Sequence, residues 1–453
     1  MWFKRIVNFA LATLAYAILL LSFQYNYFGA ASSNFFENHQ RYSESLVVGR
    51  IVESRSHGYA SHGGFLGIFT TARDRVGYQY DKYSKGDTPD SAFETYKQSA
   101  GLQGIFYYST DNIFSLAGIK NEKRLMANKL ITSALLAFLI VLFLSITASQ
   151  IGYTAAITTL VFLTASQWLV VFSNNLYWMF FLTLAPVVYS TYFLHTQNTR
   201  SVSFKLLYLG LFSIILIKSL AGYEYITTIL IASVTPLVFF SVKYKWTARN
   251  FLIRFFYSGL AGLLGFFVAI AIHLGQLTIR LGSLDNAYEL LLYTVAKRTH
   301  GQPEVVDEVY RQSLESSISE VILKYWNGVA FDLNSLFGNG GTISFNWIII
   351  FIVCLMIYGS ITSFFRTYHQ NQMRQHWALT ITFFFSLLAP ISWYVLAKGH
   401  SYIHTHLNHV LWYVPTLLWG AAYIGFIFSQ EFHWVDRLSN RKKPSSLKDY
   451  NYE

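Results

Sequence analysis

Residues 34–64 read NFFENHQRYSESLVVGRIVESRSHGYASHGG. The stretch follows a first hydrophobic run and opens a polar segment, 24–127, that contains no apolar run long enough to cross a bilayer. Most of the chain beyond this segment is apolar. The segment is therefore the first part of the chain that can hold polar groups beside a membrane, and the search for a site begins there.

A helix is expected within this stretch at 43–56. At 100° per residue, the valines and the isoleucine of 47–52 share one face. Arg50 and Glu53 point to the opposite face, where a solvated ion pair is expected. Glu44 falls inside the apolar stripe. It is either an acid that favours the positive end of the helix or a buried carboxylate with the basicity that a general base needs.

Composition places the chain in a membrane. Of its 453 residues, 53% are hydrophobic and only 13% are charged, about half the charged fraction of a soluble domain. The net charge of +11 is then a topology signal, and nucleic-acid binding is a poor explanation for it. The single cysteine, Cys354, lies in an apolar run, so no disulfide forms within the chain.

The apolar runs predict an all-α polytopic membrane protein with about ten transmembrane helices. The predicted spans are 6–23, 128–148, 151–171, 176–194, 204–220, 225–241, 252–274, 346–365, 378–397 and 408–429. They divide the chain into a signal-anchor helix (1–23), a long extracytoplasmic segment with amphipathic interfacial helices (24–127), six spans (128–274), a second extracytoplasmic segment (275–345), three spans (346–429) and a basic cytoplasmic tail (430–453).

The basic residues predict the orientation. With the N-terminus inside, fifteen Lys and Arg residues fall on inner segments, whereas the short outer connections hold only Lys218 and Lys398. This is the positive-inside asymmetry. Both termini are therefore predicted to be cytoplasmic, and 24–127 and 275–345 to lie outside.

Two polar features are predicted on the same outer face as Glu44. The first, KSLAGYE at 218–224, places Lys218 and Glu224 close to hydrocarbon, which is costly unless the two are paired, used or able to snorkel. The second, KGHSYIHTHLN at 398–408, is dense in polar groups. If the last span begins near Tyr402, a helical turn separates His400 from His404, and another separates His404 from Asn408.

The histidines allow two kinds of ligand. A His-x-x-x-His pair can hold a transition metal, but no thiolate or fixed acidic third ligand accompanies it, so a divalent metal stays a secondary option. Lys398 with two or three imidazole donors fits a phosphate or diphosphate headgroup better. A third and weaker outer feature, SNNLYW at 173–178, is a turn whose amides would suit sugar hydroxyls.

Several common signatures are missing. The sequence has no P-loop, dinucleotide fingerprint, Gly-x-Ser-x-Gly elbow or metalloprotease motif. The predicted cytoplasmic loops are too short for a nucleotide-binding domain. An enzyme of this design takes an activated substrate from the membrane on the outer face.

This arrangement resembles the GT-C class of integral-membrane glycosyltransferases, and ESLVVGRI at 44–51 resembles uncharacterised membrane proteins of bacterial surface-polysaccharide clusters. The resemblance implies a catalytic carboxylate early in the first outer segment, which is Glu44, with Glu37 and Glu53 as fallbacks. It implies that the donor phosphate is bound by Lys218, Lys398, His400, His404 and His406. Supporting residues would be Arg50, Tyr223, Glu224, Tyr402 and Asn408. The chain lacks the acidic pair of that class.

The expected function is therefore that of a glycosyltransferase of the bacterial inner membrane. It would move a sugar from a polyprenyl-phosphate donor to a cell-surface glycan or lipid acceptor, with the bilayer as its other partner and no nucleic acid. An O-antigen-type polysaccharide polymerase or ligase would share such a site. A lipid or glycan transporter is disfavoured because the spans are poor in charges.

Overall fold

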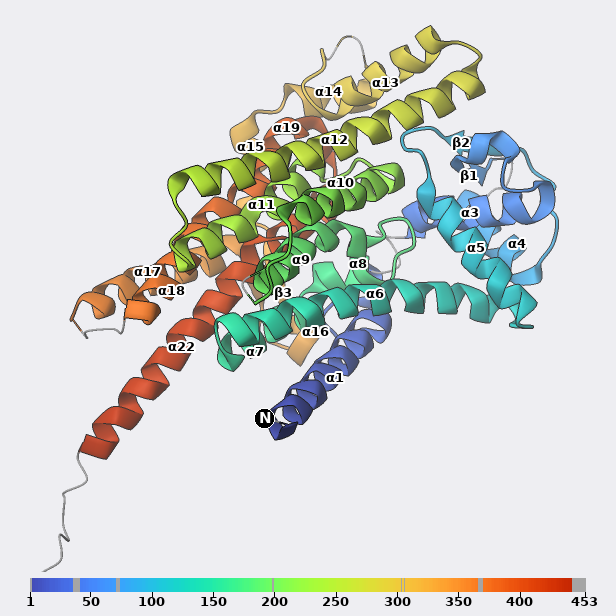
Figure 1. The fold of residues 1–453 in the computed structure, drawn as a ribbon. Helices are drawn as coiled ribbons and strands as arrows, with labels where there is room; N and C mark the ends of the chain where they lie inside the picture. The colour runs from blue at the N-terminus through green and yellow to red at the C-terminus, as the bar shows by residue number, and fades with distance from the viewer. Residues whose placement is uncertain are drawn as a thin grey trace, which may run out of the picture.

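The computed structural model describes residues 2–35, 41–70, 74–197, 199–302, 304, 306–365 and 370–441, with 2–4, 309 and 432–441 described by their backbone alone. Within this part the protein is largely helical (Figure 1). Two small antiparallel sheets, β1 (Leu66–Phe69) with β2 (Phe93–Tyr96) and β3 (Val329–Asp332) with β4 (Thr342–Ser344), belong to the two predicted outer segments.

The helices of the bundle are α1 (Trp2–Tyr25), α6 (Asn121–Gln150), α7 (Tyr153–Thr164), α8 (Gln167–Ser173), α9 (Phe180–Gln197), α10 (Phe204–Ala221), α11 (Ile226–Lys243), α12 (Ala248–Leu281), α17 (Phe345–Phe365), α18 (Gln370–Ser386), α19 (Leu388–Leu396) and α22 (Thr416–Arg441). Their order follows the predicted spans. Helix α6 begins before the predicted residue 128 and α12 continues past the predicted residue 274, so each helix extends into one of the two segments, 24–127 and 275–345, that the sequence predicts to lie outside and that are called the first and second outer segments below.

Seven helical segments of the described chain are long and apolar enough to cross a membrane, or nine if each of two bent helix pairs is one span. The bent pairs are α7 with α8, at 72°, and 405–413 with α22, at 44°. These helices indicate a membrane protein. Helix α9, where the sequence predicts the fourth span, is not among them. Neighbours in the bundle bury most of α9, so it tolerates Thr183, Ser190 and Thr191, which lower its hydropathy.

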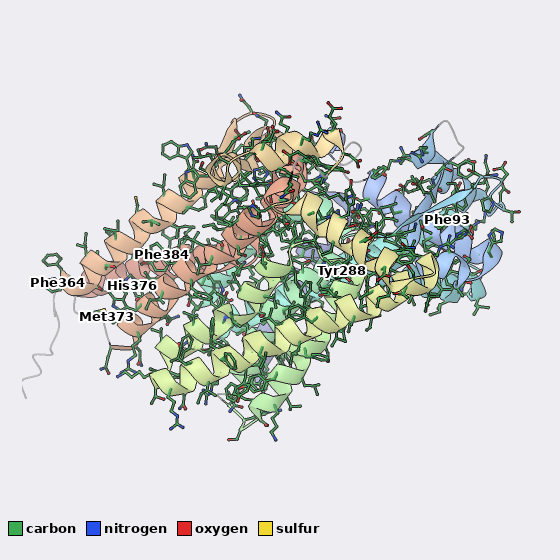
Figure 2. All side chains as sticks on the ribbon, turned by 90° about the horizontal axis from the view of Figure 1, so that it is seen from above. Phe93, Tyr288, Phe364, Met373, His376 and Phe384 are labelled. Atoms are coloured by element: carbon green, nitrogen blue, oxygen red, sulfur yellow. The ribbon has the colours of Figure 1, made fainter. Side chains whose placement is uncertain are left out.

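The helix ends meet in two groups at opposite ends of the bundle. Gln150 at the end of α6 bonds Lys243 through its carbonyl oxygen and Oε1 (2.6 and 2.9 Å), His195 through Nε2 (2.8 Å) and Gln375 through its carbonyl oxygen (3.0 Å). These four residues come from segments predicted on the inner side. Figure 2 shows Met373 and His376 at this end and Phe93 of the first outer segment at the other.

The first outer segment folds around α3 (Arg41–His57), with η1 (Ser61–Gly64), α4 (Arg75–Lys85) and α5 (Leu102–Leu116) beside it. All residues from 44 to 54 are buried, so the prediction of a solvated face on this helix is wrong. The reason is that α4, α5 and β1 pack around α3. At Gly49 a Cβ atom would come within 2.3 Å of the Gly67 carbonyl oxygen, so this close approach requires glycine.

Arg50 has a structural role at the centre of this segment. Its side chain is fully buried and donates hydrogen bonds to the carbonyl oxygens of Gly58 (3.1 Å), Tyr59 (3.0 Å) and Ser61 (2.8 Å). A buried guanidinium is tolerated because its donors are satisfied in this way. The predicted solvated pair with Glu53 is therefore replaced by a loop wrapped around Arg50.

The second outer segment contains α13 (Leu284–Arg298), α14 (Glu308–Glu315), α15 (Ile318–Trp326) and α16 (Leu333–Phe337). Before the last helix the chain forms three short helices, α20 (Lys398–Ile403), α21 (Thr405–Asn408) and η3 (His409–Tyr413). The predicted last span, 408–429, overlaps the bent pair formed by 405–413 and α22. Helix α22 begins at Thr416, directly after Pro415, which has no amide hydrogen to donate to a preceding carbonyl and therefore favours a helix start.

Candidate functional site

The candidate site is centred on an ion pair that joins two distant segments. Glu224 lies in the turn between α10 and α11, and Arg298 is the last residue of α13. Arg298 Nη1 lies 3.4 Å from Glu224 Oε1, and the side chains are 16% and 5% exposed. The hydroxyl of Tyr177, in the turn before α9, lies 3.2 Å from the same carboxylate oxygen. A charged pair this deeply buried needs close partners on every side.

The first outer segment supplies further partners. Arg298 Nη2 donates hydrogen bonds to the Tyr96 hydroxyl (3.3 Å) and to Gln98 Oε1. The Tyr96 hydroxyl also lies 3.2 Å from that of Tyr177. The end of β2, the turn before α9, the turn before α11 and the end of α13 therefore meet at a single guanidinium group.

The histidines of 398–408 complete the cluster. A continuous helix was expected here, but the helix breaks at His404, which has φ −101° and ψ 46°. The rings of His400 and His404 are nevertheless 4.4 Å apart, and those of His404 and His406 are 5.4 Å apart. Asn408 Nδ2 lies 3.4 Å from His400 Nδ1. The expected grouping of His400, His404 and Asn408 is thus present in the structure on broken helices.

Burial and neighbouring charge keep the imidazoles of His400 and His404 neutral. Desolvation, followed by the charge of His406 and Arg298, lowers the pKa of His404 to about 4. Desolvation, together with His404 and Arg298, lowers the pKa of His400 well below its ordinary value. At neutral pH each ring therefore has one N–H donor and one nitrogen acceptor, and the positive charge beside them belongs to Arg298.

Several buried polar atoms around the histidines lack a hydrogen-bond partner within the described chain: His404 Nδ1, Asn408 Oδ1, Trp393 Nε1 and Tyr225 Oη. The aromatic rings of this region are in contact: the ring centroids of Tyr225 and Trp393 are 5.6 Å apart, and those of Trp393 and His400 are 5.8 Å apart. An unpaired buried polar atom costs about 1–3 kcal/mol. A polar ligand that bonded these atoms would therefore gain from pairing them.

Two of the predicted phosphate ligands bond protein carbonyls. Lys218 Nζ donates to the backbone oxygens of Gly222 (2.8 Å) and Glu224 (3.4 Å), so it fixes the turn that presents the Glu224 carboxylate. Lys398 Nζ donates to the Leu314 carbonyl oxygen (2.5 Å) and links α20 to α14.

The two predicted supporting tyrosines contact other elements. The Tyr223 hydroxyl is bonded to the Ala269 carbonyl oxygen on α12 (3.5 Å), and Lys324 of α15 lies 3.4 Å from the centre of the Tyr402 ring. Of the residues predicted for this face, the structure thus groups Glu224, His400, His404, His406 and Asn408.

Glu44 lies in a separate cluster and is fully engaged. Its Oε2 is 2.8 Å from Lys129 Nζ and 2.9 Å from the Tyr80 hydroxyl, and its Oε1 accepts a hydrogen bond from the Leu176 amide (3.4 Å). Leu176 precedes Tyr177 in the chain. Glu44 therefore fixes the turn that brings Tyr177 to Glu224.

Of the two fallback acids, only Glu53 lies among the described residues. Glu53 is buried, and its Oε1 lies 3.0 Å from His57 Nδ1 and 3.5 Å from His62 Nε2. Glu37 lies outside the described residues. Among the residues that the structure describes, no group of three or more His, Cys, Asp or Glu side chains is arranged to hold a metal ion.

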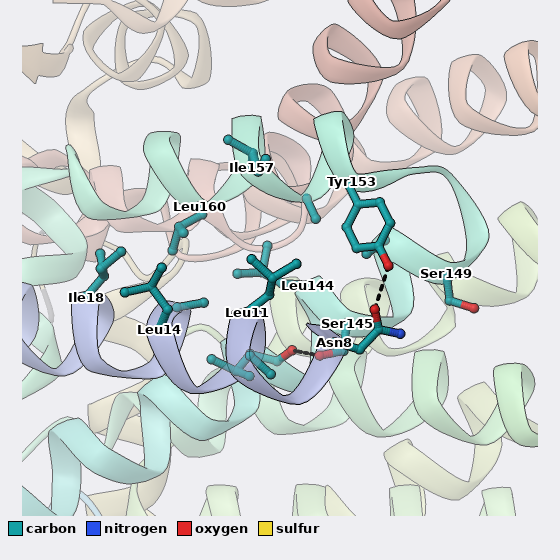
Figure 3. A pocket seen from close by; sticks show the side chains of 15 residues that line it. Asn8, Leu11, Leu14, Ile18, Leu144, Ser145, Ser149, Tyr153, Ile157 and Leu160 are labelled. Carbon is teal, nitrogen blue, oxygen red and sulfur yellow. Dashed lines mark hydrogen bonds between the residues drawn. The ribbon is translucent and has the colours of Figure 1, made fainter. Parts of the chain in front are cut away.

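A cavity of about 570 Å³ lies elsewhere, between α1, α6 and α7 (Figure 3). Leucine, isoleucine and alanine side chains form most of its wall, and the Tyr153 hydroxyl donates a hydrogen bond to Asn8 Oδ1 (2.6 Å) at its edge. None of the residues that line it belongs to the Glu224–Arg298 cluster.

Sequence reasoning missed Arg298, Tyr96 and Gln98. The available signal for Arg298 was a cation at the end of a helix in the second outer segment, but its partners lie up to 202 residues away in the chain. Comparisons of this chain with protein-family models, curated proteins and solved structures give no match.

Proposed function

We propose that this protein is a membrane glycosyltransferase that uses a polyprenyl-phosphate sugar as donor and a cell-surface glycan or lipid as acceptor. The observation that carries the proposal is the buried Glu224–Arg298 pair, surrounded by two tyrosines and two neutral histidines. A transferase of this kind needs a cation for the leaving phosphate and a base for the acceptor hydroxyl, and the pair supplies both.

Arg298 is the proposed phosphate ligand. Its guanidinium presents several N–H donors in a fixed plane, which suits phosphate oxygens, and its low exposure strengthens the interaction. His400 and His404 each add a neutral donor. This differs from the expectation based on Lys218 and Lys398, whose ammonium groups hold backbone carbonyls.

Glu224 is the proposed base in place of Glu44. Both oxygens of Glu44 are bonded, whereas Glu224 Oε2 has no hydrogen bond from any residue in the described part of the chain. Glu224 would take the proton of the acceptor hydroxyl as that oxygen bonds to the anomeric carbon. The bond from that carbon to the phosphate oxygen breaks, and the lipid phosphate leaves with the electron pair beside Arg298.

Aromatic rings line the side of the cluster where the sugar would lie. Trp178 and Tyr225 stack with centroids 5.7 Å apart, and Tyr225 meets Trp393 edge to face. Such rings combine apolar area with a polar edge, which suits the mixed surface of a sugar. The unpaired Trp393 Nε1 and Tyr225 hydroxyl would then bond sugar hydroxyls.

The proposal includes the location. The protein would lie in a bacterial inner membrane with both termini in the cytoplasm, which places the cluster at the outer face. Contacts between the two long predicted outer segments support this, since Gln276 Nε2 donates to the Gly63 carbonyl oxygen (2.8 Å) and Arg298 reaches Tyr96.

The experiment is to incubate the purified, reconstituted protein with polyprenyl-monophosphate sugars and with polyprenyl-diphosphate-linked oligosaccharides, and to measure release of the lipid carrier. We expect turnover of at least one monophosphate donor when an acceptor is present. Turnover of diphosphate-linked glycans alone would identify a polymerase or ligase. Movement of intact donor across the bilayer without cleavage would identify a transporter.

A further inference from the structure

Helix α13 carries an exposed apolar surface that its packing does not explain. On a helical wheel, Leu284, Tyr288, Leu292 and Val295 fall within an arc of about 80°. These residues are 57%, 52%, 48% and 50% exposed, respectively. A helix at a water-exposed surface normally turns its apolar residues toward the hydrophobic core of the protein. These four therefore need a different neighbour.

A second sector of the same helix makes the packing contacts. Ala287 and Thr294 are buried, and Ala287 joins Leu277 of α12 and Phe65 of the first outer segment in a small apolar cluster. A third sector, with Asp285 and Glu289, is exposed and polar. The helix thus has one face against protein, one suited to water and one that is apolar and uncovered.

The neighbouring helix indicates what covers the third face. Helix α12 has 34 residues and is therefore about 51 Å long, against about 30 Å for the hydrocarbon core of a bilayer. Its outer turns extend beyond that core, and α13 packs beside it after a sharp reversal at Gly282 (Figure 1). Exposed apolar residues of α12 continue to Ile279, next to the start of α13. Figure 2 shows Tyr288 on α13 beside α12.

We infer that α13 is an interfacial helix whose face formed by Leu284, Tyr288, Leu292 and Val295 lies in the outer boundary between lipid headgroups and acyl chains. The face continues the apolar surface of α12, which a lipid bilayer covers. Interfacial helices of this type bury their apolar side about 5–10 Å below the headgroups. The inference stands independently of the proposed catalytic activity, because it concerns only where the helix lies.

The position of the helix has a consequence for Arg298. This residue ends α13, so insertion of the apolar face would hold its guanidinium close to the depth of lipid phosphates. A lipid-linked phosphate would then reach Arg298 without leaving the membrane surface. If the proposed function is correct, α13 also sets the height at which the donor is bound.

The test compares two adjacent positions of the full-length protein in lipid nanodiscs. In a Cys354→Ser background, Tyr288→Cys and the control Glu289→Cys are each labelled with an environment-sensitive fluorophore. We expect nitroxides on lipid acyl chains to quench most of the fluorescence at 288, and aqueous iodide to quench most of it at 289.

Leu292→Cys repeats the test on the apolar face if Tyr288→Cys does not fold, as judged by a single gel-filtration peak. Equal quenching of 288 and 289 by iodide would overturn the inference, and so would acyl-chain quenching confined to 289. These readouts do not depend on turnover, so a protein inactive toward every lipid-linked sugar still tests the placement of α13.

Discussion

Lys129 Nζ lies 2.8 Å from Glu44 Oε2, so the carboxylate that the sequence identifies as a base is half of a largely buried ion pair. The Tyr80 hydroxyl bonds the same oxygen, and the Leu176 amide bonds the other. The pair joins α3 to α6 and to the turn before Tyr177. Its position argues for a role in holding the first outer segment on the bundle.

Glu44→Gln should therefore lower the stability of the folded protein and leave the rate of turnover largely unchanged. The variant leaves the Lys129 ammonium without its anion, which we expect to cost about 1–3 kcal/mol in a partly buried setting. Thermal unfolding in detergent measures the loss, and adding Lys129→Met should recover part of it. A normal melting temperature together with a 10²–10⁴-fold loss of turnover would instead assign Glu44 as the base.

Arg298→Ala should weaken donor use, because the guanidinium is the proposed phosphate ligand. We expect the loss to be about 1.5–3 kcal/mol in kcat/KM or in donor affinity. Arg298→Lys should recover little, since an ammonium lacks the planar set of donors. The adjacent Lys297→Ala is the matched control. Equal losses from both alanine variants would point to a general defect in α13.

The apolar helices could be predicted from sequence because lipid burial is a local requirement. A run of about 20 apolar residues is needed wherever the helix crosses, so α6, α10, α11 and α17 are visible without any knowledge of their neighbours. Helix α9 shows the limit of this rule. Protein covers most of its surface, and its hydropathy then says little about its place in the bundle.

The site was predictable only in part. His400, His404 and Asn408 are neighbours in the chain, so their grouping survives even though the expected continuous helix breaks at His404. The partners of Arg298 lie 74 and 202 residues away, and no local pattern encodes such contacts. The helical wheel placed Glu44 in an apolar stripe. It could not predict the ion pair with Lys129, because Lys129 lies on another helix.

Orientation is testable by cysteine accessibility in intact cells. In a Cys354→Ser background, Lys85→Cys and Glu304→Cys should react with a membrane-impermeant thiol reagent, because both positions fall in segments predicted outside. Lys205→Cys, on an inner segment, should react only after the membrane is opened. Protection of position 85 or 304 in intact cells would overturn the topology derived from the charges.

The stability of the folded protein should fall at acid pH because of His404. Its pKa is lowered from 6.5 to about 4 in the folded protein, so unfolding takes up a proton between these two values. His404 therefore costs no stability above about pH 6.5. As the pH falls from 6.5 toward 4, proton uptake by the unfolded chain lowers the free energy of unfolding by about 3 kcal/mol at most.

Melting temperatures at pH 7 and pH 4.5 measure this effect. We expect the parent protein to lose more stability than His404→Gln over this interval, because glutamine does not titrate. Arg298→Ala should raise the pKa of His404, since it removes a positive charge that lowers it. Identical pH profiles for the parent and His404→Gln would show that another group controls the acid limit.

Glu224→Gln is the sharpest test of the proposed chemistry. Glutamine keeps the size and the hydrogen bond from Tyr177 but cannot take a proton, so turnover should fall about 10²–10⁴-fold. Donor binding should survive, because Arg298 loses its ion-pair partner and becomes freer to bind phosphate. The exposed Glu94→Gln, whose carboxylate pairs with Arg75 at the surface, is the control and should be near normal. Single-turnover transfer at saturating donor separates the steps. A parental rate for Glu224→Gln would remove Glu224 from catalysis and return Glu44 and Glu53 to consideration.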